Sequence, residues 1–161
     1  MGKSTPHVMA VASAGGHWIQ LTRLSPAWRD CRVTYVTTNP DLRNMAKDVA
    51  AAAGVKQADF HSVADANRSR KFRLLLSLLQ IAFVMLRQRP DVVITTGAAP
   101  GYFALRLGRL IKCRTVWVDS IANADELSLS GQMAGKHADL WLTQWEHLAL
   151  PEGPEFHGAV V

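Results

Sequence analysis

The sequence predicts an α/β fold, a doubly wound parallel sheet of the Rossmann type formed by residues 1–161 as a single domain. Two observations predict it. Short, continuous runs of β-branched and apolar residues recur along the chain, and helical stretches separate them. Continuous apolar strands are typical of sheets buried on both faces, and strands that alternate with helices are joined by right-handed crossovers. The 161 residues, 48% hydrophobic and 19% charged, have the size and composition of one ordered globular domain.

The first half of the chain is predicted to contain three strands and three helices. Asn39-Pro40-Asp41 supplies turn residues after the second strand, and Gly54 is placed to cap the second helix. The third strand has the weakest pattern of the three. In order, the predicted elements are a strand over His7–Ala12, a helix over His17–Trp28, a strand over Arg32–Thr37, a helix over Leu42–Ala53, a strand over Val55–Phe60 and a long helix over Arg68–Arg89.

The second half continues the alternation. Pro100 suits the first position of a helix, where its missing N–H costs nothing. Ser128 is a natural N-cap residue for the helix that follows it. The predicted elements are a strand over Asp91–Thr95, a helix over Pro100–Ile111, a strand over Arg114–Val118, a helix over Ser128–His137 and a strand over Asp139–Thr143.

Bulk composition narrows the cellular setting. Cys31 and Cys113 each lie beside a strand-like run without a second cysteine or a histidine at metal-ligand spacing, which predicts reduced thiols, no metal site and a cytoplasmic setting. The apolar run at the amino terminus is too short for a signal peptide, and no stretch of the sequence predicts a membrane-spanning helix. The net charge of +5 suits an anionic partner such as a phosphorylated ligand or an acidic lipid surface. Nucleic acid is disfavoured, because the basic residues cluster around an apolar helix and do not interleave with aromatics.

Ligands of a doubly wound sheet bind beyond the carboxyl ends of the strands, where two glycine loops are expected. The first is Ser13-Ala14-Gly15-Gly16-His17 and the second is Thr95–Gly101, which contains Gly97. Each leads into a helix whose amino terminus could hold an anion, and two facing loops suit a diphosphate. The alternatives are glycine turns without a ligand and, for Gly97 and Gly101, close packing of helix on sheet. His17 is either a residue of the cap region or a proton-transfer group.

Two further loops at the same edge contain polar residues. Asp119 and Ser120 follow the strand that ends at Val118, and Asn123 lies in the same loop. Asp119 could orient a sugar hydroxyl or act as a base, although three carboxylates within this loop would oppose phosphate unless some point away. Trp145, after the last strand, could stack on a ligand, fill a subunit interface or belong to the core.

The helix over Arg68–Arg89 is apolar nearly all round between Phe72 and Leu86. Those residues would extend about 22 Å as a helix, which is short of a hydrocarbon core of about 30 Å. Because cations surround the apolar surface, we expect a peripheral contact with an anionic bilayer. Burial on both sides, for example by another subunit, is the alternative. The residues expected to contact the membrane are Arg70, Lys71, Phe72, Leu75, Leu79, Phe83 and Arg87.

Several segments together resemble a known family. Ser-Ala-Gly-Gly-His (13–17), Arg-Pro-Asp-Val-Val-Ile-Thr-Thr-Gly (89–97), Asp-Ser-Ile…Leu-Ser-Leu-Ser-Gly (119–131), Ala-Asp-Leu-Trp-Leu-Thr-Gln-Trp (138–145) and Phe-His-Gly-Ala-Val-Val (156–161) are similar to the asparagine-linked-glycosylation subunit fourteen (Alg14) family. The resemblance extends to PssD-type bacterial polysaccharide proteins and, more distantly, to the amino-terminal half of MurG. Asp119 stands where the family usually has glutamate, and Asn123 stands where a basic residue is expected.

The resemblance implies a GT-B glycosyltransferase divided between two chains. This chain would be the acceptor domain, on the cytoplasmic face of the membrane, and would bind a polyprenyl-diphosphate-linked sugar in exopolysaccharide, capsule or oligosaccharide assembly. A separate catalytic subunit would bind the UDP-sugar, and no cofactor is implied. His17 and Asp119 would be catalytic. The residues expected at the acceptor and its phosphates are Ser13, Gly15, Gly16, Gly97, Gly101, Ser120 and Asn123.

Two other functions compete with this one. The chain could be a non-catalytic membrane scaffold that activates a catalytic partner. It could also be a nucleotide-dependent oxidoreductase on the same fold, but the first loop lacks the third glycine of the dinucleotide fingerprint.

Overall fold

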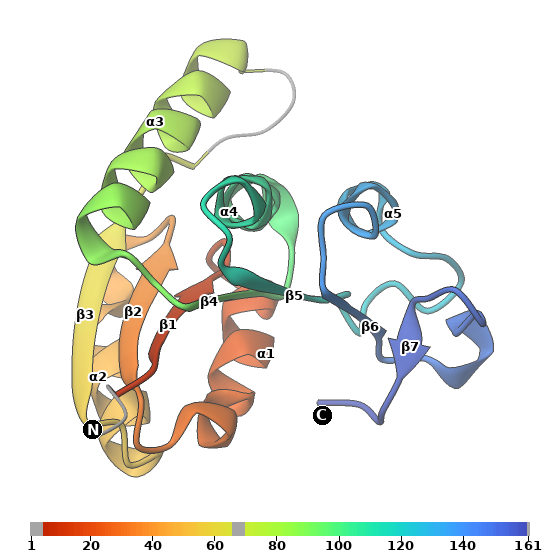
Figure 1. Cartoon of the computed structure of the whole chain (residues 1–161), viewed down its shortest axis with the longest axis horizontal. Helices are drawn as coiled ribbons and strands as arrows, with labels where there is room; N and C mark the ends of the chain where they lie inside the picture. Colours follow the sequence, from red (N-terminus) through yellow and green to blue (C-terminus); the bar gives the residue numbers. More distant parts are fainter. Residues whose placement is uncertain (1–4, 66–69, 161) are drawn as a thin grey trace.

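Seven parallel strands form one sheet in the computed structural model, which describes residues 5–65 and 70–160 (Figure 1). The strand order is β3-β2-β1-β4-β5-β6-β7, so the direction of winding reverses between β1 and β4. Such a reversal opens a crevice at the carboxyl ends of the two strands. The strands are β1 (His7–Val11), β2 (Arg32–Thr37), β3 (Gln57–Ser62), β4 (Val92–Thr95), β5 (Arg114–Val118), β6 (Leu140–Thr143) and β7 (Glu155–Phe156).

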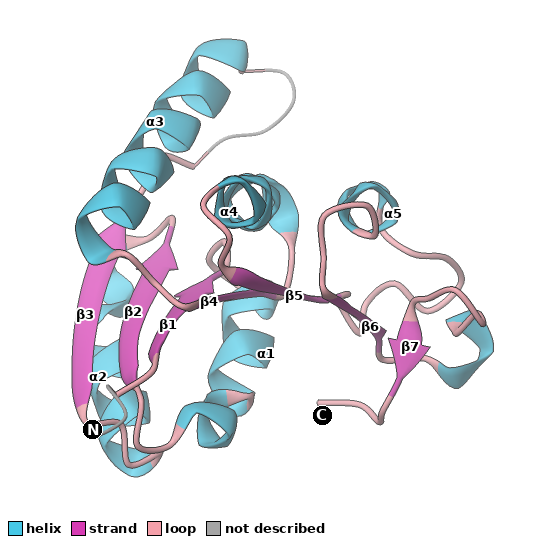
Figure 2. Cartoon of the chain, in the orientation of Figure 1, coloured by secondary structure: helices cyan, strands magenta, loops and turns pink. Residues whose placement is uncertain are grey.

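Helices cover both faces of the sheet, which confirms the predicted fold class (Figure 2). One face carries α1 (Gly16–Arg23) and α2 (Arg43–Ala52), and the other carries α3 (Lys71–Gln88), α4 (Ala98–Leu110) and α5 (Leu129–Ala134). Short 3-10 helices complete the chain: η1 (Ser25–Trp28), η2 (Pro40–Leu42) and η3 (Glu146–Leu148).

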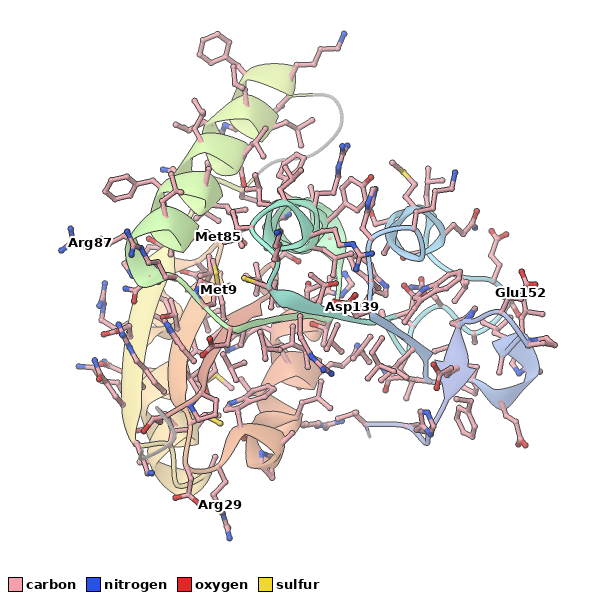
Figure 3. All side chains as sticks on the ribbon, viewed as in Figure 1. Met9, Arg29, Met85, Arg87, Asp139 and Glu152 are labelled. Carbon is pink, nitrogen blue, oxygen red and sulfur yellow. The ribbon has the colours of Figure 1, made fainter. Side chains whose placement is uncertain are left out.

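Each face of the sheet has its own apolar core. Beneath α1 and α2, the rings of Trp18 and Tyr35 meet edge to face at 5.8 Å, and Trp28 donates a hydrogen bond to the Tyr35 hydroxyl. Beneath α3 and α4, Met85 and Met9 belong to one buried cluster (Figure 3). Together the two cores bury the central strands on both sides, as their continuous apolar sequences predict.

Several element boundaries differ from the sequence prediction. The first helix ends at Arg23 and is followed by η1, because Pro26 has no N–H with which to continue the helical ladder. α4 begins at Ala98, so Pro100 is its third residue and the predicted first position was wrong. The third strand lies two residues later than predicted, at the edge of the sheet, where only one neighbour defines its register. Arg68, the predicted start of the long helix, lies outside the described residues.

β7 was missed altogether. It is a two-residue strand that pairs with the end of β6, and so short a run has no apolar periodicity for a sequence to reveal.

Candidate functional site

The two glycine loops meet at the crevice between β1 and β4. Gly15 (φ +87°) precedes α1 and Gly97 (φ +130°) precedes α4, and both backbones lie where only glycine is comfortable. Ala98 follows with φ +63°, a conformation that costs a residue with a side chain about 1–3 kcal/mol. The positive ends of two helices therefore converge on one region.

His17 locks the two loops together. Its Nδ1 lies 2.9 Å from the Thr96 carbonyl oxygen, and the Thr96 hydroxyl donates to the His17 carbonyl at 2.7 Å. A carbonyl only accepts, so Nδ1 must carry the proton, and in the neutral ring Nε2 keeps a lone pair. A Cβ on Gly97 would lie 2.8 Å from His17 Cε1, so glycine at position 97 is required for this ring position. The geometry therefore presents a histidine in the tautomer that a general base needs.

A cavity of about 280 Å³ adjoins this histidine. It combines His17 with the first residues of α4 and α5 and with the loop after β5. None of the described residues that line it carries a formal charge, so the helix amino termini are the groups there that favour an anion. Its lining residues are His17, Ala98, Ser120, Ala122, Asn123, Ser128, Leu129 and Ser130.

The predicted site residues divide into two groups. His17, Ser120 and Asn123 lie together on the cavity, whereas Ser13, Gly15 and Gly16 are outside its lining. Gly15 and Gly16 are exposed, and a Cβ at either position would meet nothing within 4 Å. No neighbouring group therefore closes off the space beside either glycine.

Gly101 has a structural explanation. It is buried, and a Cβ there would lie 1.9 Å from Thr95 Oγ1. Close packing of α4 on the sheet therefore accounts for this glycine, which is the alternative that the sequence left open, and we omit Gly101 from the proposed site.

Asp119 is a buried organising residue. Its side chain is 1% exposed, and its two carboxylate oxygens accept hydrogen bonds from Trp117 Nε1, the Asn123 amide and both the backbone N–H and the hydroxyl of Ser128. The four donors occupy the carboxylate, so it has no free position for a substrate hydroxyl. The geometry favours a positioning role for Asp119 over the catalytic role that the sequence suggested.

The other acidic residues of this loop lie outside the cavity lining. Asp125 and Glu126 are exposed and neither lines it. The apparent conflict between three carboxylates and a phosphate is thereby removed. Ser128 caps α5 as predicted, since its hydroxyl accepts a hydrogen bond from the Gly131 N–H.

Two buried glutamines, which the sequence analysis did not identify, support the loop after β5 through hydrogen bonds. Gln20 of α1 is 6% exposed and Gln144 is 4% exposed. Gln20 donates to the Ser120 hydroxyl and accepts from the Ile121 N–H. Gln144 donates to Gln20 and to the Asp119 carbonyl, and its own oxygen accepts from the Val160 N–H. The network ties α1, two strand-end loops and the segment after β7 into one unit.

The only sequence signal for Gln20 is its spacing from His17. Residues three apart share one face of a helix. Trp145 was considered as a stacking residue, a core residue or an interface residue; its indole N–H donates to the Ile121 carbonyl at 2.9 Å, so it anchors the loop after β5.

α3 carries an apolar stripe on its outer face. Ser77, Ile81, Val84 and Met85 face the sheet, while the opposite side leaves Phe72 88% exposed and Phe83 66% exposed. The members of the stripe recur at helical spacing and are Phe72, Leu75, Leu76, Leu79, Phe83 and Leu86. The cations Arg70, Lys71, Arg73 and Arg87 are all exposed at the two ends of this stripe. Within residues 5–65 and 70–160, no helix combines the length and apolar character that crossing a bilayer requires.

Comparison with known proteins gives this geometry a context. Residues 8–159 match the family described as "Oligosaccharide biosynthesis protein Alg14 like". The UDP-N-acetylglucosamine transferase subunit ALG14 of Yarrowia lipolytica is 27% identical, over 98% of this chain and 82% of the relative. The protein of the same name from Debaryomyces hansenii is 23% identical, over 96% and 76%.

Among solved structures, Acinetobacter baumannii MurG superposes with a TM-score of 0.72 at 15% identity. The match covers 96% of this chain and 45% of MurG, so the chain spans less than half the length of that protein. At this identity the likeness shows a shared Rossmann-like fold and nothing beyond the fold.

Proposed function

The chain belongs to the Alg14-like family of oligosaccharide biosynthesis proteins, and we propose that it is the acceptor-binding domain and subunit of a two-chain glycosyltransferase. Its acceptor would be a sugar carried on a polyprenyl diphosphate in oligosaccharide, exopolysaccharide or capsule assembly. The donor would be a UDP-sugar, and the names of the relatives favour UDP-N-acetylglucosamine. The same names describe subunits, which supports a second, donor-binding chain.

One observation carries the proposal: His17 lines a cavity where the helix termini converge, its Nδ1 is held by Thr96, and Nε2 has no hydrogen-bond partner among the described residues. In the proposed reaction an acceptor hydroxyl lies against Nε2. Its oxygen forms the bond to the anomeric carbon as the bond from that carbon to UDP breaks, and its proton passes to Nε2. The configuration at the anomeric carbon is inverted, and the donor-binding subunit would stabilise the departing UDP.

The diphosphate of the acceptor would bind at the amino termini of α1 and α4. The first N–H groups of a helix have no partner within it and carry its positive partial charge. The exposed backbone at Gly15 and Gly16 lets a phosphate approach closely. Ser120 and Asn123 would contact the acceptor from the opposite wall of the cavity.

The stripe on α3 would place the chain on the cytoplasmic face of a membrane as a peripheral protein. Six large apolar side chains exposed on one helix face, with cations at both ends, are typical of helices that lie in a bilayer interface. A lipid-linked acceptor would then reach the cavity from the same surface.

Replacing His17 tests the catalytic part of the proposal. With the donor-binding subunit present, His17→Ala should lower the transfer rate by about 10²–10⁴-fold, the usual contribution of a general base, while the complex still assembles. His137→Ala is the matched control, because His137 precedes β6 and its carbonyl accepts a hydrogen bond from Thr115 near the start of β5, at the opposite end of the strands from the cavity.

The same experiment separates the second candidate function. One observation favours a non-catalytic scaffold that only activates its partner. All four hydrogen bonds to the Asp119 carboxylate come from groups of this chain, so the carboxylate is not available to a substrate. If the chain is a scaffold, the complex with His17→Ala should transfer sugar at the same rate as the unmodified complex, and substitutions in the α3 stripe should abolish transfer.

A further inference from the structure

A second cavity, of about 330 Å³, lies along the open edge of the sheet beside β3. It is separate from the cavity at His17 and shares no lining residue with it. Residues from α2, β3 and the end of α3 form its walls. They are Tyr35, Arg43, Ala46, Lys47, Ala58, Asp59, Phe60, His61, Arg87 and Gln88, and we call this cavity the edge groove.

The edge groove has an excess of positive charge. Arg43, Lys47 and Arg87 contribute three cations, and among the described residues none of them forms an ion pair. The single carboxylate of the lining, Asp59, is already paired with Arg32 at 3.0 Å. An anion entering the groove would therefore meet three unneutralised cations without displacing an existing partner.

Two of the cations, Arg43 and Arg87, lie near His61 in the groove. The Arg43 guanidinium lies 4.9 Å from the centre of the Phe60 ring, which holds it against β3. Burial lowers the pKa of His61, Asp59 opposes that shift, and the charges of Arg43 and Arg87 lower it further, so both arginines act on the same imidazole. Arg43 is also the first residue of α2, where the helix dipole favours an anion.

The edge groove adjoins the apolar stripe of α3. Arg87 follows Phe83 by four residues, so the two side chains are neighbours on the helix surface. Figure 3 shows Arg87 at the end of α3 that meets β3. A molecule with its acyl chains against the stripe could place a negatively charged headgroup in the groove.

We propose that the edge groove binds the phosphate of an anionic phospholipid headgroup. This inference rests on the part of the proposed function that places α3 at a membrane. It adds a specific lipid site from α2 and β3, two elements outside the stripe. A membrane contact made by α3 alone gives the α2 cations no role, because α2 lies on the other face of the sheet.

Vesicle co-sedimentation of the full chain tests the proposal. The probes are vesicles of phosphatidylcholine alone and vesicles of equal parts phosphatidylcholine and phosphatidylglycerol. Arg43→Gln and Lys47→Gln should each weaken binding to the anionic vesicles by about fivefold, the usual effect of one cation at such a surface, and leave binding to phosphatidylcholine unchanged. Arg29→Gln removes the same charge far from α3 (Figure 3) and should change neither. Equal losses for Arg29→Gln and the two α2 variants would overturn the proposal.

Two further arms separate the alternatives. Glycerol 1-phosphate added without vesicles tests a soluble phosphate as the ligand; if it binds at Arg43 while the groove variants keep full vesicle binding, the phospholipid assignment is wrong. The double variant Leu79→Ser, Phe83→Ser tests the stripe. It should lose binding to both kinds of vesicle. If it does not, the proposed membrane contact of α3 is wrong. The loss of preference for anionic vesicles in the Arg43 and Lys47 variants then still tests the edge groove separately.

Discussion

Replacing Gly97 by alanine tests whether the loop geometry positions His17. Gly97 has φ +130° and ψ −167°, a region open essentially to glycine alone, where a side chain costs about 1–3 kcal/mol. The added Cβ would also lie 2.8 Å from His17 Cε1, so the ring must move and its hydrogen bond to Thr96 is lost, which costs about 1 kcal/mol more. The expected loss in the free energy of unfolding is therefore about 2–4 kcal/mol, and the melting temperature should fall by roughly 4–16 °C.

Gly158→Ala provides the matched control. Gly158 also has a positive φ (+109°), but a Cβ there would meet nothing within 4 Å. Gly158→Ala therefore has backbone strain comparable with that of Gly97→Ala, but its Cβ does not contact a histidine. Denaturant unfolding measures the stability of both variants, and the nitrogen chemical shifts of the His17 ring report which nitrogen carries the proton. Only Gly97→Ala should lose the Nδ1-protonated form, and with it about 10²-fold or more of the transfer rate.

The reasoning fails on a specific result. If Gly97→Ala keeps the Nδ1-protonated form of His17 and is no less stable than Gly158→Ala, then the glycine does not position the imidazole. The proposed base would then owe its orientation to a contact other than Gly97, such as the hydrogen bond to the Thr96 carbonyl.

Two further predictions concern stability. Asp119→Asn places an amide nitrogen among four donors and should lower the free energy of unfolding by about 1–3 kcal/mol; an unchanged urea midpoint would show that the four hydrogen bonds do not hold the loop. His7 is 5% exposed, and burial, followed by the charge of Arg32, lowers its pKa below the ordinary 6.5. The unfolded chain binds the proton first as the pH falls, so stability should decrease from about pH 6.5 down through the folded pKa. In His7→Asn that acid-side slope should be shallower, and an equal slope in both proteins would contradict the assignment.

The fold was largely predictable because each central strand is a continuous apolar run. β1, β2, β4, β5 and β6 all lie within a residue of their predicted bounds. The discrepancies occur where a local signal competes with the apolar pattern or where no pattern exists. Pro26 ends α1 within an otherwise helical stretch, and β3 at the sheet edge has too little apolar periodicity to define its start.

The site was predictable only as far as chain position determines it. Parallel strands bring the loops after β1, β4 and β5 to one edge, so His17, Ser120 and Asn123 could be expected together. Hydrogen-bond partners cannot be inferred in this way. Asp119 has the position of a catalytic carboxylate, and only the tertiary structure shows four donors around it. Glutamine is a residue type that is mostly exposed, yet Gln20 and Gln144 are both buried in one hydrogen-bond network.

The dependence on a second chain is the central claim, and reconstituted transfer tests it most directly. The assay measures transfer of N-acetylglucosamine from its UDP derivative to a sugar on a polyprenyl diphosphate, with this chain alone, the donor-binding chain alone, and both together. We expect transfer only when both are present, and loss of that transfer with His17→Ala. Turnover by this chain alone at the rate of the mixture would contradict the claim that it supplies only the acceptor side of the enzyme.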